Sequence, residues 1–408
     1  MYNIIINFSR YLSKFIGEGF IKEMPYAWRM PDEWNHFEQP PADKIFDIEL
    51  LKKEVGQRFP FYDVKSGPDV IVFFCRIDEM MLEENFDSLR QSLSGKGYIP
   101  MLRYEHGEHV IYVIRKTKRK ERSIWINIAL LIATIITTIL TGSILYIGKF
   151  DIWGIQNPMD VFNVSSLFYG AVLFALPLMS ILFVHEMGHY YISKKHSIAT
   201  SLPFFIPIPP ILPDINIGTF GALISSRDPM PNKKALFDVG IAGPVAGFVV
   251  ALFVIIVGIA TSEVVQIDPN SMSGQTALGS SILFILMSNL MHTIPQGFAL
   301  NLNLTAFAGW IGLLITSINL LPASQLDGGH IFRAVLGEKQ KYAGWIAVFI
   351  MIFTGWFFFA ILIVFMMGTA HPPPLNDATK LDTRRKLLFF VAIAILVMCY
   401  IPYPIYTL

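Results

Sequence analysis

The sequence predicts a polytopic α-helical membrane protein with about six transmembrane helices, a membrane-embedded loop or β-hairpin, and a small soluble α+β domain at its N-terminus. The first observation is composition: the 408 residues are 53% hydrophobic and only 15% charged, which is too apolar for an ordinary soluble protein. The second is that apolar runs of membrane length begin only after residue 122. The formal net charge of +1 gives no indication of a nucleic-acid partner.

Residues 1–122 form the predicted soluble domain, and residues 123–408 form the predicted membrane-embedded domain. The first part holds most of the acidic residues, and its apolar spacing is typical of an α+β domain, of which a ferredoxin-like fold is one candidate. The expected helices cover residues 46–59 and 80–93, and the expected strands cover residues 70–75, 97–103 and 109–115. We expect Cys75 and Cys399 to be buried thiols rather than a disulfide, and the first twenty residues to be an amphipathic leader rather than a signal peptide.

Basic clusters predict the orientation in the membrane, because the cytoplasmic flanks of membrane spans carry an excess of Lys and Arg. Residues 116–122 precede the first apolar run and Lys194 and Lys195 follow the second, so we expect the N-terminal domain in the cytoplasm of a multi-pass protein of the cell membrane. The expected spans cover residues 124–147, 168–191, 235–260, 305–321, 345–367 and 387–401. Basic residues between positions 380 and 386 conflict with a crossing fifth span, so either that run folds back as a hairpin or the bias fails locally.

The segment His185-Glu186-Met187-Gly188-His189 lies inside the second apolar run. On a helix, His185 and His189 stand one turn apart on the same face, so both imidazoles can reach one metal ion, and Glu186 is close enough to take a proton from a metal-bound water. Three ionisable groups in a membrane-length segment are costly to bury and indicate a functional site. The alternative is a chance occurrence of the pattern in a soluble core helix.

Asp327 is the strongest candidate for a third metal ligand, because a catalytic zinc normally keeps three protein ligands and leaves one position to water. It follows the fourth apolar run, in a stretch with Pro and Gly where a helix can break. His185 and Asp327 both lie toward the C-terminal ends of their segments, so the two segments must be parallel to share an ion. Parallel segments need an odd number of membrane crossings between them. The expected span 235–260 supplies one, so the short run 278–291 is expected to be re-entrant or interfacial and not a second crossing. The alternative role for Asp327 is a helix cap before a glycine turn.

Residues 202–213 are rich in proline and cannot form a regular helix. Residues 216–226, which include Gly218, Phe220 and Gly221, are typical of a strand with glycines. A hairpin beside the metal helix would offer a free strand edge, which could hold an unwound substrate by strand addition. The alternative is that these residues only fill the helix bundle.

With both motifs in view, residues 124–408 resemble the site-2 protease family of intramembrane zinc metalloproteases. The resemblance rests on the segment 185–189 and on Asn319-x-x-Pro322-x-x-x-Leu326-Asp327-Gly328, and it is supported by the glycine patterns at 218–222 and 238–244. No stretch resembles a PDZ domain. The N-terminal domain and the loop 371–377 are closer to the archaeal, cyanobacterial and plastid branch of the family.

The resemblance implies a Zn²⁺ ion bound by His185, His189 and Asp327, with Glu186 as the general base. Asn319 would orient the substrate or stabilise the oxyanion. Membrane-anchored proteins would be the substrates, cut within their transmembrane segments and often releasing a regulator. The residues expected to contact the substrate are Gly218, Phe220, Gly221, Asn319 and Pro322.

Two other functions remain open from the sequence. A catalytically silent relative would bind membrane-anchored clients and retain the motifs. A zinc transporter would need acidic and histidine ligands along a path through several spans, whereas here they converge on one place. We expect His330 and His371, which lie near the motifs, not to be ligands.

Overall fold

The structure is a computed structural model. It describes residues 46–105, 107–116, 123–148, 157–210, 217–226, 228–266, 276–323, 325–368 and 370–407. Nearly all of the described residues belong to one compact unit, Glu49–Leu408. The expected N-terminal leader and most of the basic cluster before the first span lie outside the described residues.

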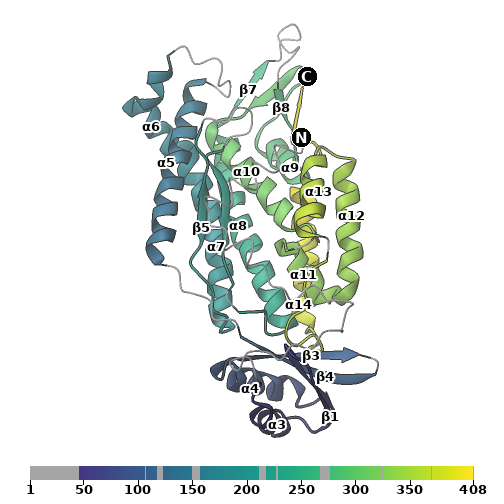
Figure 1. Cartoon of the computed structure of the whole chain (residues 1–408). Coiled ribbons are helices and arrows are strands. Elements are labelled where there is room, and N and C mark those ends of the chain that lie inside the picture. The colour runs from purple at the N-terminus through teal and green to yellow at the C-terminus, as the bar shows by residue number, and fades with distance from the viewer. Residues whose placement is uncertain are drawn as a thin grey trace. The chain divides into compact units, whose positions relative to one another are not determined.

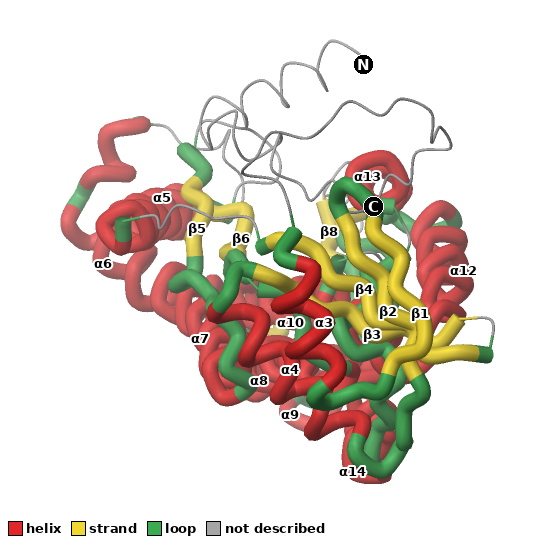
Figure 2. The backbone as a smooth tube through the Cα atoms, turned by 60° about the horizontal axis from the view of Figure 1, so that its bottom comes forward, coloured by secondary structure: helices red, strands yellow, loops and turns green. Residues whose placement is uncertain are grey.

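The described part begins with a four-stranded antiparallel sheet of order β1-β2-β4-β3, with helices α3 and α4 side by side next to it (Figure 2). Its elements are α3 (Ile48–Gly56), β1 (Phe61–Ser66), β2 (Val70–Cys75), α4 (Leu82–Gly95), β3 (Tyr98–Glu105) and β4 (Glu108–Arg115). Alternate residues of β2, ending at Cys75, are buried. Strand β1 was not predicted, because most of its residues are exposed and form no apolar run. The element order differs from the β-α-β-β-α-β order of a ferredoxin-like fold.

Three of the described helices are long and apolar enough to cross a membrane. They are α5 (Ile124–Gly148), the continuous helix Val164–Lys195, and α8 (Lys233–Ala260). The second consists of α6 (Val164–Gly170), the π-helical turn η5 (Ala171–Ala175) and α7 (Leu176–Lys195). The expectation of about six transmembrane helices is therefore not confirmed among the described residues.

Helix α8 is the central helix of this part and packs against α7, α10 (Leu304–Asn319) and α11 (Asp327–Leu336) (Figure 1). Small residues allow this close packing, because in a membrane helices associate by contact rather than by exclusion of water. A Cβ on Gly258 would lie 2.3 Å from the backbone nitrogen of Ala306 in α10, and a Cβ on Gly188 would lie 2.7 Å from the carbonyl oxygen of Ala242. Only glycine fits at these two crossings.

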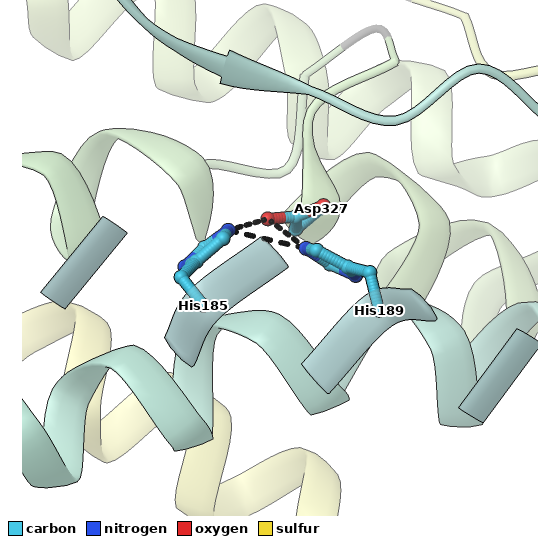
Figure 3. Close-up of side chains that lie close together, drawn as sticks. All are labelled: His185, His189 and Asp327. Atoms are coloured by element: carbon cyan, nitrogen blue, oxygen red, sulfur yellow. Dashed lines mark hydrogen bonds and ion pairs between the residues drawn. The ribbon is translucent and has the colours of Figure 1, made fainter. Parts of the chain in front are cut away.

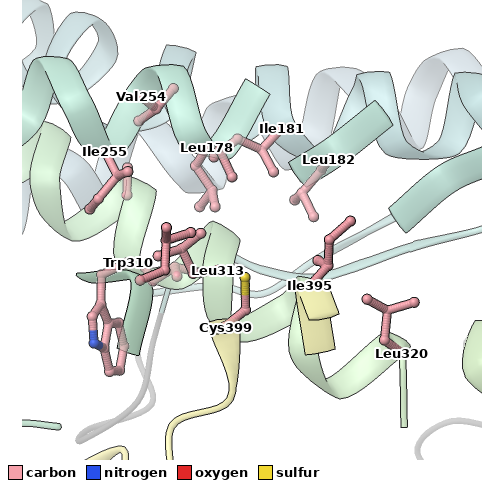
Figure 4. Close-up of a cluster of buried hydrophobic side chains, with 14 of the residues drawn as sticks. Leu178, Ile181, Leu182, Val254, Ile255, Trp310, Leu313, Leu320, Ile395 and Cys399 are labelled. Carbon is pink, nitrogen blue, oxygen red and sulfur yellow. The ribbon is translucent and has the colours of Figure 1, made fainter. Parts of the chain in front are cut away.

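Buried apolar side chains from four helices fill the space around α8 (Figure 4). Helix α14 (Thr383–Cys399) closes this core from the opposite side to α7. The free thiol of Cys399 points into it and is fully buried, as expected from the sequence. The labelled members are Leu178, Ile181, Leu182, Val254, Ile255, Trp310, Leu313, Leu320, Ile395 and Cys399.

The segment between α8 and α10 leaves from and returns to the same end of the helices. Strand β7 (Glu263–Gln266), which follows α8, pairs with β9 (Phe298–Asn301), which precedes α10. Between them lie β8 (Thr276–Leu278), paired with β10 (Ile405–Thr407), and α9 (Ile282–Met291). At about 1.5 Å per residue, the 10 residues of α9 are too short to cross the hydrocarbon. This length supports the prediction that the run does not cross.

The expected fifth span, residues 345–367, is not one helix. It is divided into α12 (Gln340–Ile352), α13 (Phe357–Leu362) and the π-helical turn η7 (Ile363–Met367), and α12 and α13 pack side by side (Figure 1). The backbone nitrogen of His371, beyond η7, donates to the side-chain oxygen of Gln340 at the start of α12 at 2.9 Å. The run therefore folds back as a hairpin, which removes the conflict with the basic residues that follow it.

Candidate metal centre

Helix α7 places His185 and His189 one turn apart on the face that points toward α8 and α11 (Figure 3). Both side chains are buried, and their Nε2 atoms face one another at 3.1 Å. The i, i+4 spacing alone produces this geometry, because residues four apart share one face of a helix.

Asp327 is brought to the same place by a break in the chain between α10 and α11. Its Oδ2 lies 3.3 Å from Nε2 of His185 and 3.2 Å from Nε2 of His189 (Figure 3). The turn requires a glycine next, since a Cβ on Gly328 would lie 2.1 Å from the carbonyl oxygen of Leu320. Among the described residues, these three are the one group of three or more His, Cys, Asp or Glu side chains that could hold a metal ion.

The three donor atoms fit a small tetrahedral cation. Bonds of about 2.0–2.1 Å in a tetrahedron separate neighbouring donors by roughly 3.3 Å, and the observed separations are 3.1, 3.2 and 3.3 Å. The Nδ1 atom of His189 lies 2.8 Å from the carbonyl oxygen of Val239 in α8. A carbonyl can only accept, so Nδ1 carries the proton and Nε2 presents its lone pair to the centre. Two imidazoles and one carboxylate form a donor set typical of a zinc ion with an open fourth position.

Glycines of α8 make room for the ligands. A Cβ on Gly243 would lie 2.0 Å from Nε2 of His189, the donor atom itself, and a Cβ on Gly247 would lie 3.0 Å from Cβ of His185. At Gly243 the space that a side chain would need is occupied by the imidazole ring of His189. Neither this role nor that of the Val239 carbonyl was found from the sequence, because both depend on how α7 and α8 cross.

Glu186 lies beside the metal ligands on α7 and is buried, with 8% of its surface exposed. Its carboxylate interacts electrostatically with His189 and Asp327. In the described part of the chain it makes no hydrogen bond or ion pair, so nothing there competes for its oxygens. A buried carboxylate without a protein partner beside a metal centre is suited to accept a proton from water.

Asn319, the last residue of α10, also reaches the centre. Its Nδ2 lies 3.4 Å from Nε2 of His185. Pro322 is placed differently: it is buried, and its carbonyl accepts a hydrogen bond of 2.8 Å from the Gln340 side chain. Pro322 thus shapes the break before Asp327.

The glycine-containing stretch forms a two-stranded antiparallel hairpin of β5 (Phe204–Pro207) and β6 (Thr219–Leu223). Strand β5, in the proline-rich segment, was not predicted as a strand. Strand β6 packs against α7, which carries the histidines, and Phe220 on it is 62% exposed. Gly218 and Gly221 have φ values of +82° and +90°, which favour glycine.

Helix α5 holds the hairpin at both ends through polar side chains that the sequence did not single out. Asn127 Nδ2 donates to the carbonyls of Leu202 and Pro203 at 2.8 and 3.0 Å. Thr137 Oγ1 donates to the carbonyl of Gly218 at 2.7 Å. These hydrogen bonds satisfy backbone groups of irregular chain beside apolar helices.

His330 and His371 do not join the centre. Their rings contact each other with centroids 4.3 Å apart. His330 lies one turn after Asp327 in α11, and His371 follows the helical hairpin. The expectation that neither is a ligand agrees with this placement.

The fold and the site together describe a helical membrane protein with a candidate histidine–histidine–aspartate metal centre. Residues 173–363 match the model of peptidase family M50. This match confirms the resemblance of the chain to the site-2 protease family.

Curated relatives include plant proteins named probable zinc metalloproteases. The chain is 27% identical over 256 residues to "Probable zinc metalloprotease EGY1, chloroplastic" of Arabidopsis thaliana, covering 58% of this chain and 44% of that protein. It is 27% identical over 247 residues to the EGY2 protein of the same plant, covering 58% and 42%. The match to the EGY1 protein of Oryza sativa subsp. japonica is 26% over 261 residues, covering 60% and 43%.

The matched region spans less than half of the length of these relatives. Their names place them in the chloroplast, so a cell-membrane location and a cytoplasmic N-terminal domain stay predictions for this chain. No solved structure matches the chain.

Proposed function

We propose that this protein is a zinc metalloendopeptidase that cleaves the transmembrane segments of membrane-anchored proteins. One observation carries the proposal: three donor atoms converge at tetrahedral spacing beside an unpartnered carboxylate, on a helix long enough to cross a membrane. The names of the plant relatives support zinc as the metal and proteolysis as the activity.

His185, His189 and Asp327 would hold the zinc. When bound, zinc supplies Lewis acidity that polarises a scissile carbonyl and makes a water molecule acidic near neutral pH. Glu186 takes the proton from the attacking water and passes it to the leaving amine. Asn319, within reach of the centre, donates its amide hydrogens to the carbonyl oxygen on which negative charge develops.

The substrate is held as an extended strand. An intact helix uses its own carbonyls in hydrogen bonds, so a transmembrane substrate must unwind before its peptide bond reaches the centre. Strand β6 pairs with β5 along one edge, and Phe220 beside it is exposed. Strand addition at the other edge, over Gly218, Phe220 and Gly221, would satisfy the substrate backbone within the membrane. Substrates with helix-breaking residues are preferred.

Cleavage of a model membrane-anchored substrate by the full-length protein tests the proposal, with bound zinc quantified in every variant. We expect one zinc per chain in the wild type, and Glu186→Gln should retain the zinc while cleavage falls by about 10²–10⁴-fold. His189→Ala should lose both. Glu338→Gln is the control, because Glu338 is an exposed carboxylate just after the end of α11. This variant should bind zinc and cleave the substrate like the wild type.

The outcomes separate the proposal from its rivals. A wild type without zinc would contradict the metal site. Zinc at one per chain, with no cleavage of any transmembrane substrate tested, would favour a silent relative that binds clients. Zinc carried across sealed vesicles by wild type but not by His189→Ala would favour a transporter.

A further inference from the structure

A pocket lies away from the metal centre, where helices α8 and α14 begin and α11 ends. Its volume is about 530 Å³. Three lysines and several apolar side chains face it together. The lining residues are Lys233, Ala334, Val335, Ala378, Thr379, Lys380, Leu381 and Lys386.

We call this pocket the basic pocket. The neighbouring carboxylates do not fully neutralise the charge of its three lysines. Lys386 makes no ion pair within the described part of the chain. Lys380 pairs with Glu79 at 3.0 Å, but both side chains are exposed, 85% and 71%, so the pair is weak and easily exchanged. Lys233 lies 3.4 Å from Asp377, whose carboxylate is already bound by Arg333 at 2.7 Å. An anion in the pocket would therefore meet ammonium groups that are available to it.

Thr379 gives independent evidence of a ligand. It lines the pocket and is only 2% exposed, yet its hydroxyl has no hydrogen-bond partner among the described residues. A buried hydroxyl without a partner is costly, and a bound water, ion or larger ligand that accepts its hydrogen removes that cost. An anionic oxygen would accept its hydrogen.

The apolar part of the pocket selects an amphipathic ligand. Val335 and Leu381 line it together with the lysines, and the neighbouring side chains of Leu336 and Leu387 are 38% and 64% exposed. Helix α8 has the length and hydropathy of a membrane span, so its first residue, Lys233, lies near a membrane surface. Basic pockets between helices at that level suit lipid headgroups.

We propose that the basic pocket binds the phosphate of an anionic phospholipid, with Lys386, Lys380 and Lys233 around the phosphate, the Thr379 hydroxyl donating to it, and the apolar wall against the glycerol and acyl region. This site is separate from the metal centre and does not depend on the proposed proteolysis.

Titration of delipidated full-length protein in a neutral detergent tests the site, with bound lipid counted by native mass spectrometry. The probes are phosphatidylglycerol, phosphatidylcholine and glycerol 3-phosphate. We expect one tightly held phosphatidylglycerol, with weaker binding of the other two. Lys386→Gln should weaken phosphatidylglycerol binding about fivefold, the loss for one charge near a membrane surface. Thr379→Val, which removes the hydroxyl but keeps the shape, should weaken it about tenfold.

Arg384→Gln is the matched control, because Arg384 is exposed in the same turn of α14 and does not line the pocket. It should change the affinity by less than about twofold, as expected for a screened surface charge. Lys386→Arg keeps the charge and should bind like the wild type, which separates a binding effect from misfolding; thermal unfolding of each variant checks this directly.

Three results would overturn the proposal. Equal losses in Lys386→Gln and Arg384→Gln would show general charge attraction without a site. Phosphatidylcholine bound as tightly as phosphatidylglycerol would remove the role of net anionic charge. Glycerol 3-phosphate bound as tightly as the lipid would make a free phosphate compound, and not a phospholipid, the ligand.

Discussion

At the scale of single residues, the metal centre depends on the absence of a side chain at Gly243 in α8 as much as on the two histidines of α7. The ligand nitrogen of His189 lies where a side chain at position 243 would begin, and the ring is held from its other nitrogen by the Val239 carbonyl. A hydrogen bond of this kind fixes which nitrogen can bind a metal, and losing such support typically lowers metal affinity 10–100-fold.

Gly243→Ala should therefore remove the metal. The new Cβ would sit 2.0 Å from Nε2 of His189, so the ring or the helix must move, at a cost of about 1–3 kcal/mol for overpacking. We expect bound zinc to fall from one per chain to near zero while the protein remains folded, measured by metal analysis and thermal unfolding of the same samples. Gly247→Ala is the control: its Cβ would lie 3.0 Å from Cβ of His185, a contact that small shifts relieve. Full zinc occupancy in Gly243→Ala would contradict this account.

The donor side chains could be named from the sequence because their geometry is local. His185 and His189 share a helix face by spacing alone, and Asp327 follows a run that must end where Pro322 and Gly328 interrupt it. Gly243 belongs to the glycine pattern 238–244 that supported the family resemblance, but its contact with a candidate metal ligand could not be predicted. That contact forms where α7 crosses α8. His189 and Gly243 are 54 positions apart in the sequence, so no local pattern predicts it.

At the scale of elements, the predictions fail where the composition of a segment does not match the secondary structure that it forms. The run 345–367 is apolar throughout, so hydropathy predicts one span, yet α12 ends at Ile352 and the chain turns before α13. Strand β5 was missed for the opposite reason: its sequence is rich in proline and unlike that of a strand, and it forms through its pairing with β6. Packing partners, and not the runs themselves, decide both cases.

The helical hairpin predicts that residues before and after it face the same side of the membrane. In sealed vesicles, Glu338→Cys and Lys380→Cys should react with an impermeant maleimide from one side, because the Gln340 side chain is bonded to the backbone of His371. Met159→Cys is the control and should react from the other side; Met159 is 71% exposed and lies in the 3-10 helix η4 (Pro158–Phe162) before α6.

The native thiols should stay silent in this experiment. Both are buried, and burial raises the pKa of Cys75 to about 12, which leaves almost no reactive thiolate. Reaction of Glu338→Cys and Lys380→Cys from opposite sides would show that the run 345–367 crosses once.

At the scale of the whole molecule, one half-buried carboxylate joins three helices that are far apart in the sequence. Asp238 near the start of α8 accepts hydrogen bonds from Arg385 in α14, at 2.7 Å from Nε and 2.5 Å from Nη2. Its Oδ2 also lies 2.9 Å from Nε2 of His196 at the end of α7. These contacts make Asp238 a structural link among α7, α8 and α14.

Asp238→Asn should destabilise this assembly without touching the metal ligands. The substitution keeps the size of the side chain but removes the charge that holds both nitrogens of Arg385, and charge-assisted hydrogen bonds contribute about 1.5–3 kcal/mol. We expect a loss of about 2 kcal/mol in the free energy of unfolding, measured by denaturation in detergent, with zinc occupancy retained at low temperature.

Asp382→Asn is the control for Asp238→Asn, because it also removes a negative charge near Arg385 but leaves the contacts of Asp238 intact. Asp382 also pairs with Arg385, but its side chain is 48% exposed, and it caps α14 by accepting from the backbone nitrogen of Arg385 at 2.9 Å. Asparagine keeps that cap, so the loss should stay below about 1 kcal/mol. Equal losses in the two variants would mean that Asp238 acts only as a surface charge, and α7, α8 and α14 would then be held together by their apolar contacts alone.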